Sequence, residues 1–130
     1  SQGQALNALK AVFGAHIAFV QEHPGVPRLI FQELQHAHGT PLKDRVQQLM
    51  TAYRQLVTGL LEQAQQEFSV SAQTDVKAAA VLFVGAIQGL VMQSLTAGTF
   101  EVMSLQASSV YDIYERGLLA DPSSPSRTNV

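Results

Sequence analysis

Apolar side chains recur at three- and four-residue steps through most of the chain, from Ala5 to about Leu119. This spacing places them on one face of an α-helix, and no apolar run alternates with the period of two expected for a half-buried strand. The pattern therefore predicts an all-α domain with five helices. Their expected bounds are residues 4–22, 26–36, 41–68, 75–97 and 101–119.

Proline and capping residues separate these helices. His23 should end the first helix, because a residue that precedes proline avoids the helical region. Thr40 is a suitable N-cap for the third helix, and Pro41 suits its first turn, where a missing N–H costs nothing. Thr74 is the expected N-cap of the fourth helix. The sequence thus supplies a start or a stop signal at most of the expected boundaries.

The two ends of the chain differ in composition from the helical domain, which we expect to cover residues 4–120. Residues 121–130 are rich in proline and serine and have few apolar side chains, which is typical of a disordered tail. Residues 1–3 are interpreted as a remnant of the expression sequence. A total of 130 residues suits one domain with one core.

The helix expected at residues 75–97 is the most informative segment. Between Ala78 and Met92 only Gln88 is polar, so apolar side chains surround the helix. Such a helix must be buried on all sides, and a small domain has too little interior to cover it. A central helix in a monomeric bundle is one alternative, but the pattern favours burial against a second copy of the chain. The helix has a small-residue face, Ala78, Gly85, Gly89 and Thr96, and a bulky face, Phe83, Ile87, Leu90 and Val91.

The last expected helix carries two apolar stripes, which indicates two neighbours. Together, the fourth and fifth helices of two subunits would form a four-helix interface with isologous symmetry. The sequence leaves open which face of the fourth helix meets the partner. The residues expected in this interface are Ala78, Leu82, Gly85, Gly89, Gln93, Val102, Leu105, Ser109, Val110, Ile113 and Tyr114.

Composition supports a covered surface and narrows the function classes. Charged residues make up 14% of the chain, against roughly 25% in an ordinary soluble domain. The net charge is −2 and the basic residues do not cluster, so this chain alone should not bind nucleic acid. The uninterrupted apolar run, Ala78 to Ile87, is shorter than the about 20 residues that a bilayer requires. We expect a cytoplasmic protein without a membrane anchor.

Catalytic and metal-binding patterns are weak in this sequence. The chain has no cysteine, which excludes disulfides and thiolate ligands. His36 and His38 are two residues apart and so point to different sides of a helix. The sequence contains neither a nucleophile elbow nor a glycine-rich phosphate loop. We expect no enzyme activity and no cofactor, and only the pair His16 and Tyr53 merits a test as a reactive site.

Three segments carry a resemblance to a known family. They are residues 19–33 (FVQEHPGVPRLIFQE), residues 80–94 (AVLFVGAIQGLVMQS) and residues 111–118 (YDIYERGL). In their order and spacing they resemble the fifth-to-sixth helix break, the eighth helix and the end of the ninth helix of the TetR (tetracycline-repressor-like) family of bacterial transcription regulators. The resemblance covers the C-terminal domain of that family, without the N-terminal helix-turn-helix headpiece that binds DNA.

The resemblance implies a regulatory mechanism. The first four helices would enclose a pocket for a small hydrophobic effector, the last two would form a homodimer, and the second would lie nearest the headpiece. Effector binding would then change the spacing of two headpieces on an operator, whose half-sites lie about 34–36 Å apart. DNA would be contacted only through the missing headpiece. The resemblance thus implies the effector-sensing and dimerisation domain of a transcriptional repressor.

The candidate pocket residues come from turning the apolar stripes inward, and not from a family motif. Ligand pockets are mostly apolar with a few placed polar groups. Each candidate could instead be ordinary core, or in the case of Arg54 a solvated surface residue. A stand-alone dimerisation module without a ligand is the main alternative function, and a small helical enzyme or carrier that uses the same cavity is the second. The pocket candidates are Phe13, His16, Ile17, Phe31, Met50, Tyr53, Arg54, Val57, Phe83 and Ile87.

Overall fold

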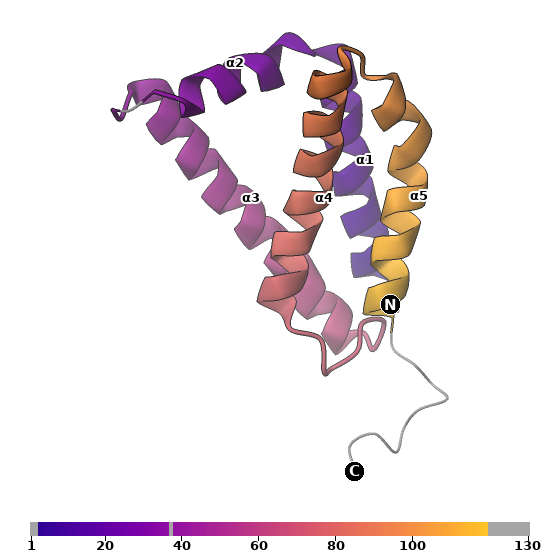
Figure 1. The fold of residues 1–130 in the computed structure, drawn as a ribbon. Coiled ribbons are helices and arrows are strands. Elements are labelled where there is room, and N and C mark those ends of the chain that lie inside the picture. The colour runs from indigo at the N-terminus through magenta and orange to yellow at the C-terminus, as the bar shows by residue number, and fades with distance from the viewer. Residues whose placement is uncertain (1–2, 37, 120–130) are drawn as a thin grey trace.

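The computed structural model describes residues 3–36 and 38–119 (Figure 1). Within these residues it contains five α-helices and no strands, which confirms the all-α prediction. The tail expected at residues 121–130 lies outside the described residues, as do Ser1 and Gln2. The helices are α1 (Gln4–Glu22), α2 (Gly25–Leu34), α3 (Pro41–Gln66), α4 (Val76–Ala97) and α5 (Glu101–Leu118).

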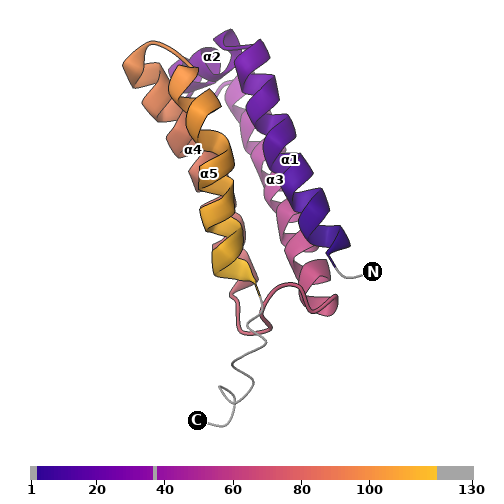
Figure 2. The ribbon, with the colours of Figure 1, turned by 90° about the vertical axis from the view of Figure 1, so that its right-hand side faces the viewer.

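The long helices form two layers, with α1 and α3 in one and α4 and α5 in the other (Figure 2). Helix α4 packs against both α3 and α5, and α1 contacts all three other long helices. The start of α1, the α3–α4 loop and the end of α5 lie at one end of the molecule (Figure 1). There the Ser71 N–H donates to the Leu118 carbonyl at 3.0 Å, and the Ala5 N–H donates to Glu67 Oε1 at 3.1 Å. These bonds join three segments that are distant in the sequence.

The core lies between the two layers and is continuous. Its widest side chains include Phe13 on α1, Phe83 on α4 and Tyr111 on α5. The ring of Phe13 contacts those of Phe83 and Tyr111, with centroids 5.6 and 5.1 Å away. Aromatic pairs at such distances stabilise a fold beyond the area that they bury. This cluster joins α1, α4 and α5 in the middle of the molecule.

Helix α3 diverges from α4 toward the end where α2 crosses (Figure 1). Its buried residues, Val57, Leu61 and Ala64, all belong to its C-terminal half. Helix α2 contains no buried residue. As a result, Leu29 and Leu34 on α2 and Leu49 on α3 stay exposed, although the sequence pattern marked them as inward-facing. The apolar stripes of α2 and of the first half of α3 are therefore largely uncovered in one chain.

Several helix ends differ from the predicted ones by one or two residues. Asp75, and not Thr74, caps α4, because its carboxylate accepts from the Ala78 N–H at 3.1 Å. Helix α2 ends at Leu34, two residues early. Helix α3 ends at Gln66, so Phe68 lies beyond it with a φ of 63° and its side chain 78% exposed. In contrast, the Thr40 cap was predicted correctly, since its hydroxyl accepts from the Lys43 N–H at 3.1 Å.

Helix α4 is also long and apolar enough to cross a membrane by length and composition, with a mean hydropathy of 1.8 over its most apolar window. Core helices of soluble proteins have the same composition. In this chain one side of α4 packs on α3 and α5, including Phe83, Ile87 and Leu90, all buried. The apolar composition of this side is thus explained by the core.

Candidate functional site

The outer sides of α4 and α5 form an exposed apolar surface. On α4 the small residues Ala78 and Gly85 are exposed, together with Leu82, which is 60% exposed. On α5 Leu105 and Ile113 are 71% and 72% exposed. Large apolar side chains exposed to this degree on adjacent helices are typical of an interaction site. We call this the α4–α5 face, defined by Ala78, Leu82, Gly85, Gln93, Leu105, Ser109 and Ile113.

The two faces of α4 that the sequence distinguishes have different surroundings in the structure. The bulky face turns into the core of its own chain, while the small-residue face is outward. A Cβ added at Gly85 or Gly89 would meet no atom within 4 Å, so a neighbouring helix could approach the backbone there. The small-residue face is therefore the side of α4 that remains available to a partner.

The expected interface residues divide into three groups. Those of the α4–α5 face are exposed, and Gly89, Val102 and Val110 are partly buried. Tyr114 departs from the expectation, because its ring is buried in the core and its hydroxyl donates to the Ala79 carbonyl at 2.7 Å. Tyr114 belongs to the buried side of α5, together with Met103, Tyr111 and Leu118. Tyr114 therefore joins two helices of one chain and does not lie on the surface.

The candidate pocket residues occupy different surroundings in the structure. Phe13, Ile17, Val57, Phe83 and Ile87 are all buried and packed in the core. Two hollows at the surface of the described residues do not include these five. Their burial agrees with the ordinary-core interpretation, and their role in a pocket stays a prediction.

His16 and Tyr53 are brought together at the point where α3 diverges. His16 Nδ1 and the Tyr53 hydroxyl share a hydrogen bond of 2.9 Å, and both side chains are partly buried. Burial lowers the pKa of His16 and raises the pKa of Tyr53 to about 12. Both shifts favour the neutral forms. A tyrosine with a raised pKa is a poorer source of phenolate, so the pair has the properties of a satisfied structural contact.

The other three pocket candidates occupy different surroundings. Met50 is partly buried and packs against the core. Phe31 on α2 is exposed, because α2 contacts α3 and leaves its apolar side largely uncovered. Arg54 is exposed and lines a surface groove between α3 and α4. Of the ten pocket candidates, Arg54 is thus the one that lies at an observed hollow.

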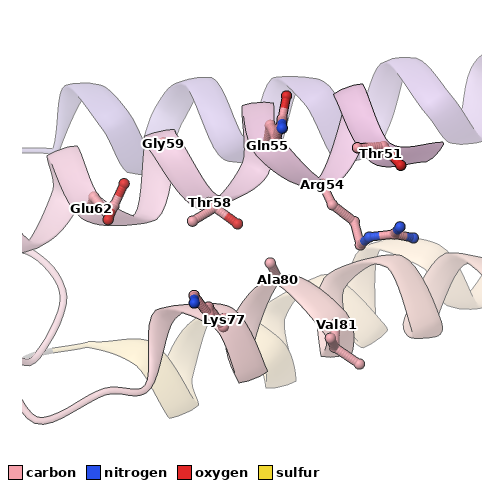
Figure 3. Close-up of a pocket in the computed structure, with 9 residues that line it drawn as sticks. All are labelled: Thr51, Arg54, Gln55, Thr58, Gly59, Glu62, Lys77, Ala80 and Val81. Atoms are coloured by element: carbon pink, nitrogen blue, oxygen red, sulfur yellow. The ribbon is translucent and has the colours of Figure 1, made fainter. Parts of the chain in front are cut away.

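The groove between α3 and α4 has a volume of about 510 Å³ (Figure 3). Its walls are the part of α3 from Thr51 to Glu62 and the first turns of α4. Sequence reasoning overlooked most of it, because its residues lie between the apolar stripes and the solvent-facing sides of both helices. The sequence signal that could have revealed the groove is a polar stripe on each of two consecutive helices, α3 and α4, which run antiparallel and so face each other. The lining residues are Thr51, Arg54, Gln55, Thr58, Gly59, Glu62, Lys77, Ala80 and Val81.

A second, shallower hollow of about 440 Å³ lies along the outer side of α3, lined by residues between Asp44 and Gln55. All its lining residues belong to one helix, so it lacks an opposite wall. Among the described residues, no cluster of three or more histidine, aspartate or glutamate side chains is arranged to hold a metal ion. The groove between α3 and α4 is therefore the better candidate for a ligand.

Comparison with protein families identifies a related domain. The family described as "Tetracyclin repressor-like, C-terminal domain" matches residues 5–107. This range contains α1 to α4 and the first part of α5. No curated protein and no solved structure matches the chain.

Proposed function

Because this chain belongs to the family of tetracyclin repressor-like C-terminal domains, we propose that it is the effector-sensing and dimerisation domain of a transcriptional repressor. Domains of this family are regulatory. The effector would be a small, mainly hydrophobic molecule in the cytoplasm, and DNA would be bound by a separate headpiece. The observation that carries the proposal is the α4–α5 face, which one chain leaves exposed and which suits a second copy.

The physical argument for the homodimer is that the α4–α5 face contains both large and small apolar residues, which can fit together when two copies of the face meet. Leu82, Leu105 and Ile113 supply large apolar side chains, while Gly85 and Ala78 leave room for them. In an isologous dimer each patch meets the same patch on the partner, so protruding leucines can pack against the small residues. Burial of such side chains is worth about 1.5–3 kcal/mol each.

Light scattering on the whole chain at micromolar concentration tests the dimer. We expect twice the 14.0 kDa mass of one chain. Leu105→Glu should give a monomer, because it places a charge within the α4–α5 face, at a side chain that is 71% exposed. Leu49→Glu is the matched control, since Leu49 on α3 is 64% exposed and lies outside that face. A monomeric wild type, or a Leu105→Glu dimer, would contradict the proposed interface.

Effector sensing is tested by a thermal-shift screen of small hydrophobic and amphipathic molecules. A ligand that binds the native state raises the melting temperature by mass action. Binding should also change the affinity of the full-length regulator for its operator, because an effector must favour one arrangement of the dimer to alter DNA binding.

The alternative function is a homodimerisation module without a ligand. One observation favours it, namely that Phe13, Val57 and Phe83, which were predicted to line a pocket, are buried in the hydrophobic core. Both proposals predict a homodimer, but only effector sensing predicts that a compound in the thermal-shift screen raises the melting temperature. A dimer that no compound stabilises would support the alternative.

A further inference from the structure

The α3–α4 groove has an apolar floor and charged ends (Figure 3). Ala80 and Val81 on α4 and Gly59 on α3 supply the apolar part. A Cβ added at Gly59 would meet no atom within 4 Å, so space remains above the α3 backbone. The volume of about 510 Å³ lies within the roughly 300–1,000 Å³ that small-molecule sites occupy. The groove can therefore receive the apolar body of a small molecule.

The charges in the groove are unevenly distributed. Lys77 and Glu62 lie toward one end, on opposite walls, and Arg54 lies toward the other end (Figure 3). Lys77 therefore has a carboxylate on the facing wall, whereas Arg54 has none at its end. Within the described part of the chain the observed ion pair joins His36 and Glu33, and no carboxylate oxygen lies within 4 Å of the Arg54 guanidinium. Neither Arg54 nor Lys77 thus has an ion pair among the described residues, but Glu62 lies opposite Lys77, and no acidic residue lines the Arg54 end of the groove.

The chemistry of Arg54 selects the kind of anion. A guanidinium presents parallel N–H donors that match the two oxygens of a carboxylate, which gives charge-assisted bonds with defined geometry. Thr58 lines the groove one turn after Arg54, and its hydroxyl can donate to the same group. The Thr51 hydroxyl, one turn before Arg54, already donates to the Gln47 carbonyl at 3.0 Å. A carboxylate at this end would also be kept away from Glu62 at the other.

We propose that the α3–α4 groove binds a small amphipathic carboxylic acid, with its carboxylate on Arg54 and its apolar body along Ala80 and Val81. This proposal rests on the proposed function, because it assigns the site and the chemical class of the effector. It moves the binding site from the aromatic core, where the sequence placed it, to the surface between α3 and α4.

The position of the groove offers a physical route from ligand to dimer. Val81 lines the groove and is followed directly by Leu82 of the α4–α5 face. The second turn of α4 therefore contributes to both the α3–α4 groove and the α4–α5 face. A ligand that contacts Val81 would bias the orientation of α4, and a ligand shifts an equilibrium only through such differential contact.

Isothermal titration calorimetry of the whole chain with octanoate tests the proposal. Octanoate should bind at least about tenfold more tightly than 1-octanol, which has the same apolar body and no charge. Arg54→Gln should weaken octanoate binding at least about tenfold, and Arg54→Lys should give an intermediate loss because it keeps the charge without the fork. Arg45→Gln is the matched control, because Arg45 is an exposed arginine on α3 outside the groove.

The location of binding needs its own readout. In ¹H–¹⁵N spectra, octanoate should shift the Arg54 side-chain Nε–Hε signal and leave that of Arg45 in place. Equal binding of octanoate and octanol, an unchanged affinity in Arg54→Gln, or no octanoate binding at millimolar concentration would overturn the proposal. If a neutral compound stabilises the dimer while octanoate does not bind, the carboxylate site fails and the effector-sensing function stands.

Discussion

At the scale of single residues, His16 and Tyr53 show how burial sets protonation. The side chains share a hydrogen bond of 2.9 Å between α1 and α3, and the Tyr53 ring lies near Phe83 with centroids 6.2 Å apart. The shared bond satisfies one ring nitrogen and one hydroxyl that would otherwise be costly to bury. The surroundings are therefore suited to neutral side chains and unsuited to an imidazolium.

This environment predicts an acid-sensitive contribution to stability. The pKa of His16 is lowered from its ordinary value of 6.5 by burial, so the unfolded chain binds the proton more readily than the folded chain. The stabilising contribution is fully present above pH 6.5 and is lost as the pH falls through that value toward the lowered pKa. Urea unfolding at about pH 7.5 and about pH 5.5 should show a smaller free energy of unfolding at the lower pH.

Two histidine variants check the assignment. His16→Gln should flatten this part of the pH dependence, because glutamine does not titrate and still offers a partner to the Tyr53 hydroxyl. His23→Gln, at the exposed end of α1, should leave it unchanged. An identical pH dependence in His16→Gln and the wild type would show that His16 is not the responsible group.

The surroundings of two predicted site residues could not be read from the sequence. Tyr114 was predicted in the dimer interface and Phe13 in a pocket, and the structure has both in one aromatic cluster. A helical stripe identifies which side chains avoid water, but it does not identify the neighbour that covers them. The contact between Tyr114 and the Ala79 carbonyl depends on how α5 lies on α4, which local periodicity does not determine.

At the scale of elements, α3 ends under strain. Phe68 follows the last turn in the left-handed region, with a φ of 63°, and the Ser69 N–H donates to the Ala64 carbonyl at 2.9 Å. This is the position that glycine usually occupies after a helix. A residue with a Cβ pays about 1–2 kcal/mol to adopt that conformation, and the exposed ring recovers little of this by packing.

Phe68→Gly should therefore stabilise the chain relative to Phe68→Ala. Both variants remove the exposed ring, but only glycine relieves the backbone strain. Glycine also gains freedom in the unfolded chain, which offsets about 0.4–1 kcal/mol of the benefit, so we expect a net gain of roughly 0.5–1 kcal/mol. Chemical denaturation of the two variants measures the difference. A Phe68→Gly chain less stable than Phe68→Ala would mean that the left-handed conformation is not retained.

The helices themselves were largely predictable because their start and stop signals are local. The Thr40 cap and the end of α1 at His23 follow from residues within a few positions. The cap of α4 was misplaced by one residue because Thr74 and Asp75 are both good caps, and the choice depends on the loop. The Thr74 carbonyl accepts from Gln65 Nε2 at 3.1 Å, which shows Thr74 engaged in the α3–α4 loop and leaves Asp75 at the helix start.

Helix α2 illustrates the limit of periodicity. Its apolar side chains have the spacing of a buried face, but Leu29, Phe31 and Leu34 are all exposed. Apolar periodicity predicts that a helix face is covered, but it does not determine whether the covering residues come from the same chain or from a partner. The α4–α5 face is a second example, because its apolar residues are as periodic as those of the core.

At the scale of the whole molecule, the family and the fold were accessible from the sequence, and the groove was not. The fold depends on the periodicity and order of the helices, and both can be read from short stretches of the sequence. The groove depends on the angle at which α3 leaves α4, and its polar residues resemble an ordinary solvated side. Arg54 was identified as a candidate through its position beside an apolar stripe, whereas Lys77 and Glu62 carried no signal until the two walls were placed opposite each other.

The proposed dimer makes the stability of the whole molecule depend on its concentration. If the α4–α5 face is covered only in the dimer, folding is linked to association, and the melting temperature rises with protein concentration. Scanning calorimetry between about 2 and about 200 μM should show this rise in the wild type and in Leu49→Glu. Leu105→Glu should melt at a lower temperature that does not change with concentration, because its unpaired face gains nothing from mass action. A wild-type melting temperature that stays constant across this range would mean that one chain is stable with Leu82, Leu105 and Ile113 exposed, and the apolar face would then need a different occupant.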